Sequence, residues 1–201
     1  SSKMEIVRNP ELAKNCKNNS SGELPKKIKK FISVGRLVKS KDHITSIKAF
    51  SKVAKKYPEV IFEIWGEGPE KSAIFYLIKK LGLQNRIFLK GISFDHTKIY
   101  SKGSIMITST RYESDGLSVR ESTAYGVPVL CFDDVPSIKL HVSHFYNGII
   151  CSTSNRINNL AESIEIILKN PKIFQAINNQ PILQMKNQKN SFSWEEFINS
   201  Q

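Results

Sequence analysis

The segment from Thr110 to Leu130 carries the residues that are best suited to chemistry. Glu113 lies in a loop after a predicted strand, and Glu121 lies inside the helix that Gly116 opens, with seven residues between the two acids. The first turn of that helix offers unpaired N–H groups at residues 116–118 and the positive end of the helix dipole, which together suit a phosphate. Glycine at the helix start lets a ligand approach the backbone closely. The segment therefore predicts an anion site.

Two carboxylates beside such a site are poor phosphate ligands but good acceptors for sugar hydroxyls. One carboxylate can accept both hydroxyls of a vicinal diol such as ribose. Glu113, nearer the loop tip, is placed for a second polyol beyond the phosphates. The alternatives are that Glu113 caps the helix and that Glu121 is a solvated surface acid, as most charged residues are. The Gly-Leu helix start and the following strand entry Gly126-x-Pro128-Val129 favour a nucleotide sugar.

A fold in which strands alternate with helices must position these residues. Apolar runs and turn residues predict strands at 4–9, 31–34, 60–65, 86–91, 104–110, 128–132 and 148–151. Helical periodicity predicts a helix that includes Ile74 and ends at Gly82, and further helices at 43–57, 96–100, 116–126, 156–170 and 192–200. This alternation indicates βαβ units, a parallel sheet and helices on both of its faces. Ligands bind at the carboxyl ends of such strands, so we expect the site in residues 35–41, 66–69, 91–95, 110–117 and 133–137.

Composition and charge exclude several classes of function. The 201 residues (22.8 kDa) have a net charge of +12, but residues 1–56 hold 15 basic and 4 acidic residues while residues 57–201 hold 15 and 14. Of the 30 basic residues 24 are lysine, whereas proteins that read nucleic-acid bases rely more on arginine. We therefore expect a local anion site and no nucleic-acid partner.

Other patterns argue against a membrane span, a secretion signal or a metal site. No run approaches the roughly 18 apolar residues of a membrane span, and the N-terminus is polar. Cys16, Cys131 and Cys151 are an odd number without ligand spacing, which favours a reducing compartment and inert, buried thiols. His141-x-x-His144 near Cys131, Asp133 and Asp134 is too loose to predict a metal. His43, at a helix start, is expected on the surface.

Six segments, taken in order, form a recognisable signature. They are Gly35-Arg36-Leu37 with Lys41, Ile64-x-Gly66-x-Gly68-Pro69, Leu81-Gly82-Leu83 through Gly91, Glu113-x-x-Gly116-Leu117-x-x-x-Glu121-x-x-Ala124-x-Gly126-x-Pro128-Val129, Asn147-Gly148 and Phe192-Ser193-Trp194-Glu195. This signature resembles that of glycosyltransferase family 4 (group 1), whose members are retaining transferases of the two-Rossmann GT-B fold. With Tyr112 before Glu113, the signature also resembles the wall-teichoic-acid glucosyl- and N-acetylglucosaminyl-transferase branch.

The resemblance implies a role for each matching residue. Arg36 and Lys41 would hold the donor diphosphate and stabilise the charge that develops as it leaves, and Glu113 would hold the transferred sugar. Glu121 would hold the ribose. Further donor contacts would come from Gly35, Gly91, Ile92, Gly116, Leu117 and Ser118. No cofactor or metal is implied, because protein cations neutralise the diphosphate. The sequence departs from the family pattern at Asp42, Asp115, Arg120, Ser122 and Thr123, which puts the identity of the donor sugar in doubt.

The resemblance covers one half of a GT-B enzyme, and it implies three segments. We expect a linker at 1–30, a Rossmann-like nucleotide-sugar-binding domain at 31–170 and, at 171–201, C-terminal helices that pack toward an absent N-terminal domain. The parent enzyme would transfer a hexosyl unit from a nucleotide diphosphate sugar, uridine-linked in our expectation, to a polysaccharide, lipid or wall-polymer acceptor. This chain alone would bind the donor without transferring it. We expect it in the cytoplasm, with peripheral association at the inner face of the membrane.

Two other classes of function stay open. The chain could be a non-catalytic nucleotide-binding partner subunit of a glycosyltransferase complex. Alternatively, it could be a basic module in which residues 1–56 dock on an anionic polymer or membrane.

Overall fold

A computed structural model describes residues 28, 30–101, 104–144 and 146–170. The predicted strand at 4–9, the helix at 192–200, the C-terminal segment 171–201 and Cys16 lie outside the described residues. So does nearly all of the predicted linker. The described part holds the sheet, the helices that cover it and every residue predicted for the site.

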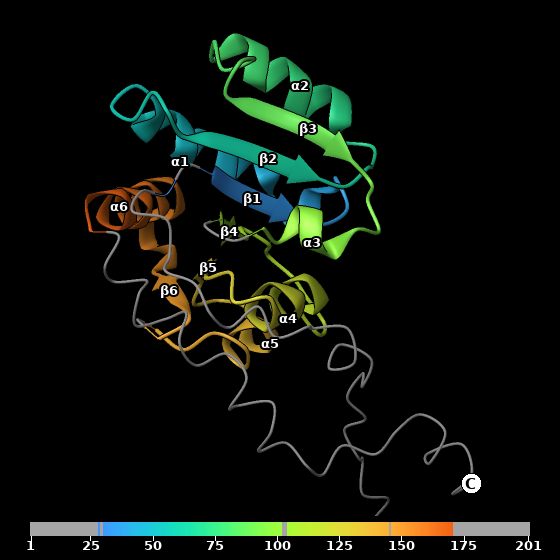
Figure 1. Cartoon of the computed structure of the whole chain (residues 1–201), viewed down its shortest axis with the longest axis vertical. Helices are drawn as coiled ribbons and strands as arrows, with labels where there is room; N and C mark the ends of the chain where they lie inside the picture. The colour runs from blue at the N-terminus through green and yellow to red at the C-terminus, as the bar shows by residue number, and fades with distance from the viewer. Residues whose placement is uncertain (1–27, 29, 102–103, 145, 171–201) are drawn as a thin grey trace, which may run out of the picture.

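Six strands form one parallel sheet in the order β3-β2-β1-β4-β5-β6 (Figure 1). Their bounds are β1 Lys30–Val34, β2 Ile61–Trp65, β3 Ile87–Gly91, β4 Ser104–Ile107, β5 Val129–Phe132 and β6 Gly148–Cys151. The central strand β1 pairs with β2 on one side and β4 on the other, so the direction in which the sheet grows reverses between β1 and β4. A reversal of this kind is a topological switch point, outside which open α/β sheets bind their ligands.

Helices cover both faces of this sheet, as predicted. The helices are α1 His43–Ala54, α2 Lys71–Lys80, α3 His96–Ile99, α4 Leu117–Ala124, α5 Pro136–Lys139 and α6 Arg156–Lys169, with 3-10 turns η2 Lys39–Lys41 and η3 Thr153–Asn155. Alternate strand residues face opposite ways: Phe31 and Leu130 pack with α1, α2 and α6, whereas Ile32 and Val129 pack with α3, α4 and α5. The predicted Rossmann-like α/β architecture is confirmed.

Two predicted boundaries were wrong, and one short helix was not predicted. β4 ends at Ile107 and not at residue 110, because the hydroxyls of Ser109 and Thr110 donate to the carbonyls of Asp42 (2.5 Å) and Ser40 (3.0 Å) in the loop after β1. α1 ends at Ala54 and not at residue 57. The short helix α5, with proline in its first turn, lies where we expected a loop.

The two cysteines in the described residues are buried, as expected from the sequence. Cys131 and Cys151 are free and buried. Burial raises the pKa of the Cys131 thiol, and it raises the pKa of Cys151 to about 11. Both thiols are therefore protonated at neutral pH and unreactive.

His43 is buried, so its predicted surface position was wrong. Its side chain sits at the start of α1 under the loop that follows β1, with an exposed fraction of 4%. Nε2 lies 3.2 Å from the Arg36 carbonyl, which can only accept, so Nε2 carries the proton and Nδ1 accepts from the Ser33 hydroxyl (3.2 Å). The neutral ring thus holds the backbone of the residue assigned to the diphosphate.

Burial also predicts how stability depends on pH. Desolvation lowers the pKa of His43 from its ordinary 6.5, so the unfolded chain takes up the proton first as pH falls. We expect the free energy of unfolding to fall below about pH 6.5, at up to about 1.4 kcal/mol per pH unit, until the folded ring is protonated too. Urea unfolding from pH 7 to pH 5 measures this slope. His43→Gln should flatten it. An unchanged slope in His43→Gln would assign the pH dependence to other groups.

Candidate functional site

An ion pair spans the switch point between β1 and β4. Lys41, at the end of η2 after β1, pairs through Nζ with Oε2 of Glu113, in the loop after β4. Both side chains are largely buried, with exposed fractions of 22% and 17%. The lysine stem lies against Gly35, where an added Cβ would be 3.6 Å from Cδ. The two residues predicted to bind diphosphate and sugar therefore meet, although 72 positions separate them.

The N-terminus of α4 lies beside this pair. Gly116 is the N-cap with φ +71°, and no side chain caps the helix, so the alternative that Glu113 is a cap is wrong. The carbonyl of Gly116 accepts from the N–H groups of residues 119 and 120. In the described part of the chain, no hydrogen bond uses the N–H of Leu117 or Ser118. The predicted anion-binding N–H groups are thus available, with Leu117 44% exposed.

The carboxylate of Glu121 is largely buried and hydrogen-bonded, so the alternative that it is a solvated surface acid is wrong. Its side chain is 14% exposed, Tyr100 donates its phenol hydrogen to Oε2 (2.8 Å), and His96 Nδ1 lies 3.8 Å from Oε1. Burial, reinforced by the charge of Glu121, raises the pKa of Tyr100, so the phenol stays protonated and remains a donor. Tyr100 in turn stacks on Tyr125 at 5.6 Å between ring centroids. Sequence reasoning missed this support from α3, because nothing local links the two helices.

Three predicted residues lie at the same edge of the sheet but outside this cluster. Arg36 is exposed, and its guanidinium forms no ion pair with a described residue. Gly91 ends β3 with φ +72°, and its carbonyl accepts from the Gly66 N–H at 2.7 Å. Ile92 follows with 67% exposure. The structure shows no contact that joins these three to Lys41 or Glu113.

The Gly-x-Gly-Pro turn after β2 packs against the loop that carries Arg36. A Cβ on Gly66 would lie 2.0 Å from the Gly35 carbonyl oxygen, and one on Gly68 would lie 2.4 Å from the Leu37 carbonyl oxygen. The Leu37 N–H donates to the Glu67 carbonyl at 2.9 Å. Both glycines are required because two backbones touch here, so this turn positions the loop after β1.

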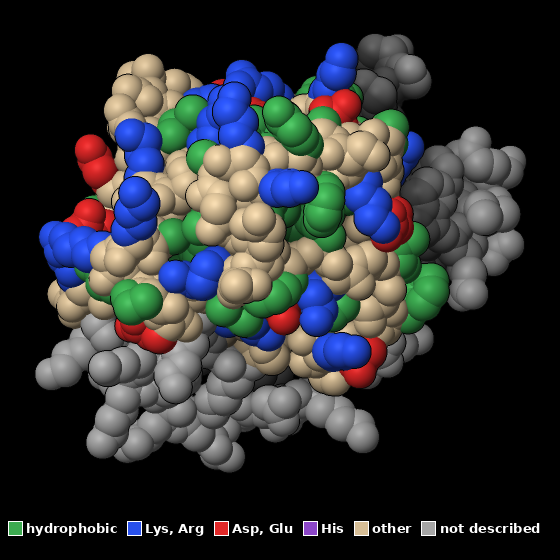
Figure 2. Space-filling model, turned by 90° about the horizontal axis from the view of Figure 1, so that it is seen from above, with side chains coloured by type: hydrophobic (Ala, Val, Ile, Leu, Met, Phe, Trp, Pro, Cys, Tyr) green, Lys and Arg blue, Asp and Glu red, His purple; other side chains and the backbone are tan. Residues whose placement is uncertain are grey.

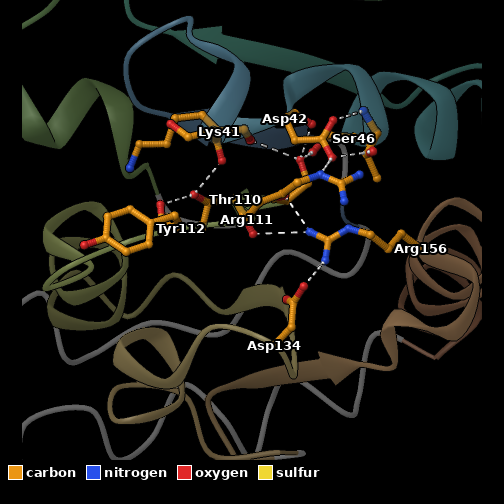
Figure 3. A network of polar contacts seen from close by, with 11 residues as sticks. Lys41, Asp42, Ser46, Thr110, Arg111, Tyr112, Asp134 and Arg156 are labelled. Atoms are coloured by element: carbon orange, nitrogen blue, oxygen red, sulfur yellow. Dashed lines mark hydrogen bonds and ion pairs between the residues drawn. The ribbon is translucent and has the colours of Figure 1, made fainter.

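Arg156, which sequence reasoning missed, ties the loops of the site to α6 (Figure 3). Its Nη2 donates to the Ser109 carbonyl (2.7 Å), its Nη1 pairs with Asp134 Oδ2 (2.6 Å), and its guanidinium lies 3.9 Å from the centroid of the Phe132 ring. Arg111 extends the network from the loop after β4 to Asp42. A cation in the first turn of a helix opposes the helix dipole, and this was the one available signal that Arg156 has a tertiary partner.

Two departures from the family pattern have a structural cause. Asp42 is, among the described residues, the non-glycine residue with positive φ (+46°), a backbone region that favours glycine. Its carboxylate compensates by accepting from the N–H (3.3 Å) and hydroxyl (2.8 Å) of Thr45 as the N-cap of α1. The other departure is a pair, because Asp115 Oδ2 and Arg120 Nη1 meet at 2.8 Å beside the site.

Both histidines of the His141-x-x-His144 pattern make hydrogen bonds to the backbone. Nε2 of His141 lies 3.0 Å from the Asp115 carbonyl oxygen, and Nδ1 of His144 accepts from the Ile150 N–H at 2.9 Å. Within the described ranges, no group of three His, Cys, Asp or Glu side chains could hold a metal ion. Within the same ranges, the helices are too short or too polar to cross a membrane.

Three bacterial proteins are similar to this chain over about three quarters of its length. A poly(glycerol-phosphate) alpha-glucosyltransferase of Bacillus subtilis (strain 168) is 30% identical over 157 residues, covering 78% of this chain and 23% of that protein. A poly(ribitol-phosphate) alpha-N-acetylglucosaminyltransferase of Staphylococcus aureus (strain COL) is 31% identical over 150 residues, covering 73% and 28%. An uncharacterized glycosyltransferase of Haemophilus influenzae is 29% identical over 146 residues, covering 73% and 41%. The chain therefore spans less than half the length of these curated relatives.

Solved structures and a family model agree with them. A mutant of S. aureus TarM, in complex with fondaparinux, alpha-GlcNAc-glycerol and UDP, superposes with a TM-score of 0.75 at 25% identity, covering 89% of this chain and 37% of that one. The pneumococcal O-GlcNAc transferase GtfA, in complex with UDP and GlcNAc, shares the fold with a TM-score of 0.67 at 24% identity, covering 79% and 34%. The family model described as "Glycosyl transferases group 1" matches residues 6–182. The resemblance seen in the sequence is thus confirmed, and the chain belongs to the group 1 glycosyl transferases of GT-B fold.

Proposed function

We propose that this chain is the donor-binding part of a retaining glycosyltransferase and that it holds a uridine diphosphate hexose at the switch point. The observation that carries the proposal is the Lys41–Glu113 ion pair across the switch point, beside the free N–H groups of α4. A cation, helix amides and carboxylates at one edge of the sheet match the diphosphate and the hydroxyls of a nucleotide sugar. The similar TarM and GtfA structures contain UDP, which supports a uridine-linked donor.

Each side chain would meet one part of the donor. Lys41 and the exposed Arg36 would neutralise the diphosphate together with the α4 amides. Glu121 would accept the two ribose hydroxyls, while Tyr100 keeps its carboxylate oriented. Glu113 would accept hydroxyls of the transferred sugar.

The ion pair indicates how the site would respond to the donor. Lys41 and Glu113 neutralise each other, which limits the free-energy cost of holding two charges in a partly buried position. A diphosphate would compete for Lys41 and so release Glu113 to the sugar. In the reaction the bond from the anomeric carbon to the diphosphate oxygen breaks. The acceptor oxygen bonds to that carbon on the same face and gives its proton to the departing diphosphate oxygen, and Lys41 stabilises the diphosphate as it leaves.

In this proposal the acceptor is bound by the whole protein and not by this chain alone. The relatives named for poly(glycerol phosphate) and poly(ribitol phosphate) favour a wall polymer, with a polysaccharide or a lipid-linked acceptor as further candidates. Because the chain spans less than half of those relatives, we propose that it binds the donor but does not transfer sugar alone. Robust transfer by the 201-residue chain would contradict that part of the proposal.

Calorimetric titration of the 201-residue chain with UDP tests the donor site. Lys41→Ala is expected to weaken binding by about tenfold or more, because a charge-assisted contact to phosphate contributes about 1.5–3 kcal/mol. Lys39→Ala is the matched control, since Lys39 lies in the same 3-10 turn and is exposed, and it should bind UDP like the parent chain. Absence of UDP binding, or equal losses in the two variants, would contradict the proposed site.

A further inference from the structure

The outward surface of α1 and α2 is cationic. The two helices pack side by side on one face of the sheet and contain no acidic residue. All five of their lysines are exposed, and one of them, Lys71, pairs with Glu67; the five are Lys48, Lys52, Lys71, Lys79 and Lys80. Among the described residues, no ion pair involves Lys48, Lys52, Lys79 or Lys80. Helix α6, on the same side of the sheet, differs because Glu165 pairs there with Lys56 and Lys169.

Two aromatic side chains stand out of this cationic surface. The inward face of α2 is formed by Ile74 and Ile78, with exposed fractions of 1% and 3%. Tyr76 projects from the opposite side of the helix with 68% exposure, and Phe75 beside it is 59% exposed. Figure 2 looks down on the end of the molecule that carries α2, and it shows lysine and arginine side chains spread across this end with hydrophobic side chains between them. Core packing explains neither aromatic residue.

The face leaves the donor site free. In a parallel α/β fold the helices lie over the sheet, whereas the switch-point crevice lies at the carboxyl ends of the strands. Lys41 and Glu113 are at that edge, so a surface that covers α1 and α2 does not cover them. A partner can therefore occupy this face while a nucleotide sugar enters.

We propose that this α1–α2 face (Lys48, Lys52, Lys71, Phe75, Tyr76, Lys79 and Lys80) docks on the surface of an anionic lipid bilayer. Lysines near a bilayer attract acidic headgroups, and aromatic rings settle at the level of the headgroups with their apolar parts in the membrane. A soluble anionic polymer would also attract the lysines, but it offers nothing apolar to Phe75 and Tyr76. The membrane therefore matches both features of the face. The inference does not depend on whether the carboxyl edge of the sheet binds a nucleotide sugar.

Co-sedimentation with vesicles tests the proposal with the 201-residue chain. We expect binding to vesicles that contain phosphatidylglycerol and none to vesicles of phosphatidylcholine alone. Lys79→Ala with Lys80→Ala should weaken binding by about 25-fold, at about fivefold for each lysine. Phe75→Ser with Tyr76→Ser should weaken it by about tenfold or more, because the apolar contact is lost.

A matched control separates this face from the general positive charge. Lys98 on α3 and Lys139 on α5 are exposed on the other side of the sheet, and their double alanine variant should bind vesicles like the parent chain. Circular dichroism and thermal unfolding establish that each variant folds. UDP titration of the same variants reports the donor site separately.

Three results would overturn the proposal. The first is an equal loss in the Lys98/Lys139 control and the Lys79/Lys80 variant. The second is full vesicle binding by the Phe75/Tyr76 variant together with equally tight binding of the parent chain to soluble polyphosphate, which would identify a polymer site. The third is a loss seen only when Lys14 and Lys17 are replaced, which would assign binding to the N-terminal segment.

Discussion

Replacing Glu121 with alanine is expected to weaken UDP binding by roughly 100-fold or more. In the proposed complex this carboxylate accepts both ribose hydroxyls, and each hydrogen bond to a charged acceptor contributes about 1.5–3 kcal/mol. Calorimetry of the folded variant measures the loss. Glu162→Ala is the matched control, because Glu162 is an exposed glutamate within α6, and its UDP affinity should equal that of the parent chain.

The support of Glu121 by Tyr100 refines this test. Tyr100→Phe removes the hydroxyl that lies 2.8 Å from Oε2 but leaves the ring that stacks on Tyr125. The carboxylate remains, so the loss of affinity should be smaller than in Glu121→Ala and should fall between that variant and the control. Full UDP binding by Glu121→Ala would remove this residue from the donor site, whereas full binding by Tyr100→Phe would show only that the carboxylate needs no support.

Replacing Gly66 with alanine is expected to lower the free energy of unfolding by about 3 kcal/mol or more. The added Cβ would lie 2.0 Å from the Gly35 carbonyl oxygen, a backbone atom that cannot rotate away, at a residue with φ +139°. Overpacking and a strained backbone are among the mechanisms that produce such large losses. Urea unfolding at neutral pH measures the change.

Two further glycines separate the clash from the backbone strain. Gly82 also has positive φ (+68°), but nothing lies within 4 Å of an added Cβ, so Gly82→Ala should show the strain alone, about 1–2 kcal/mol. Gly68 is outside the positive-φ set, and its Cβ would lie 2.4 Å from the Leu37 carbonyl oxygen, so Gly68→Ala should show the clash. Equal losses in Gly66→Ala and Gly82→Ala would mean that the loops after β1 and β2 are not in contact.

The sequence by itself determined the elements and the chemistry of single segments. Runs such as Phe31–Val34, closed by glycine, favour a buried strand, and the periodicity of 156–170 favours a helix that buries one face. The region 110–130 likewise shows its helix start and its two carboxylates without any distant partner. These features are local, because they depend on residues within a few positions of one another.

The tertiary structure decided which distant residues share the site. The order of the strands brings β1 beside β4 and so places Lys41 against Glu113. Packing of α3 against α4 brings Tyr100 to Glu121, and the burial of His43 depends on the loop folded over it. Local sequence patterns do not reveal such contacts, because the pattern around a lysine, tyrosine or histidine is the same whether its side chain faces water or a partner. Periodicity thus predicted which segments form strands and helices, and long-range packing fixed where some of them end and which residues meet at the switch point.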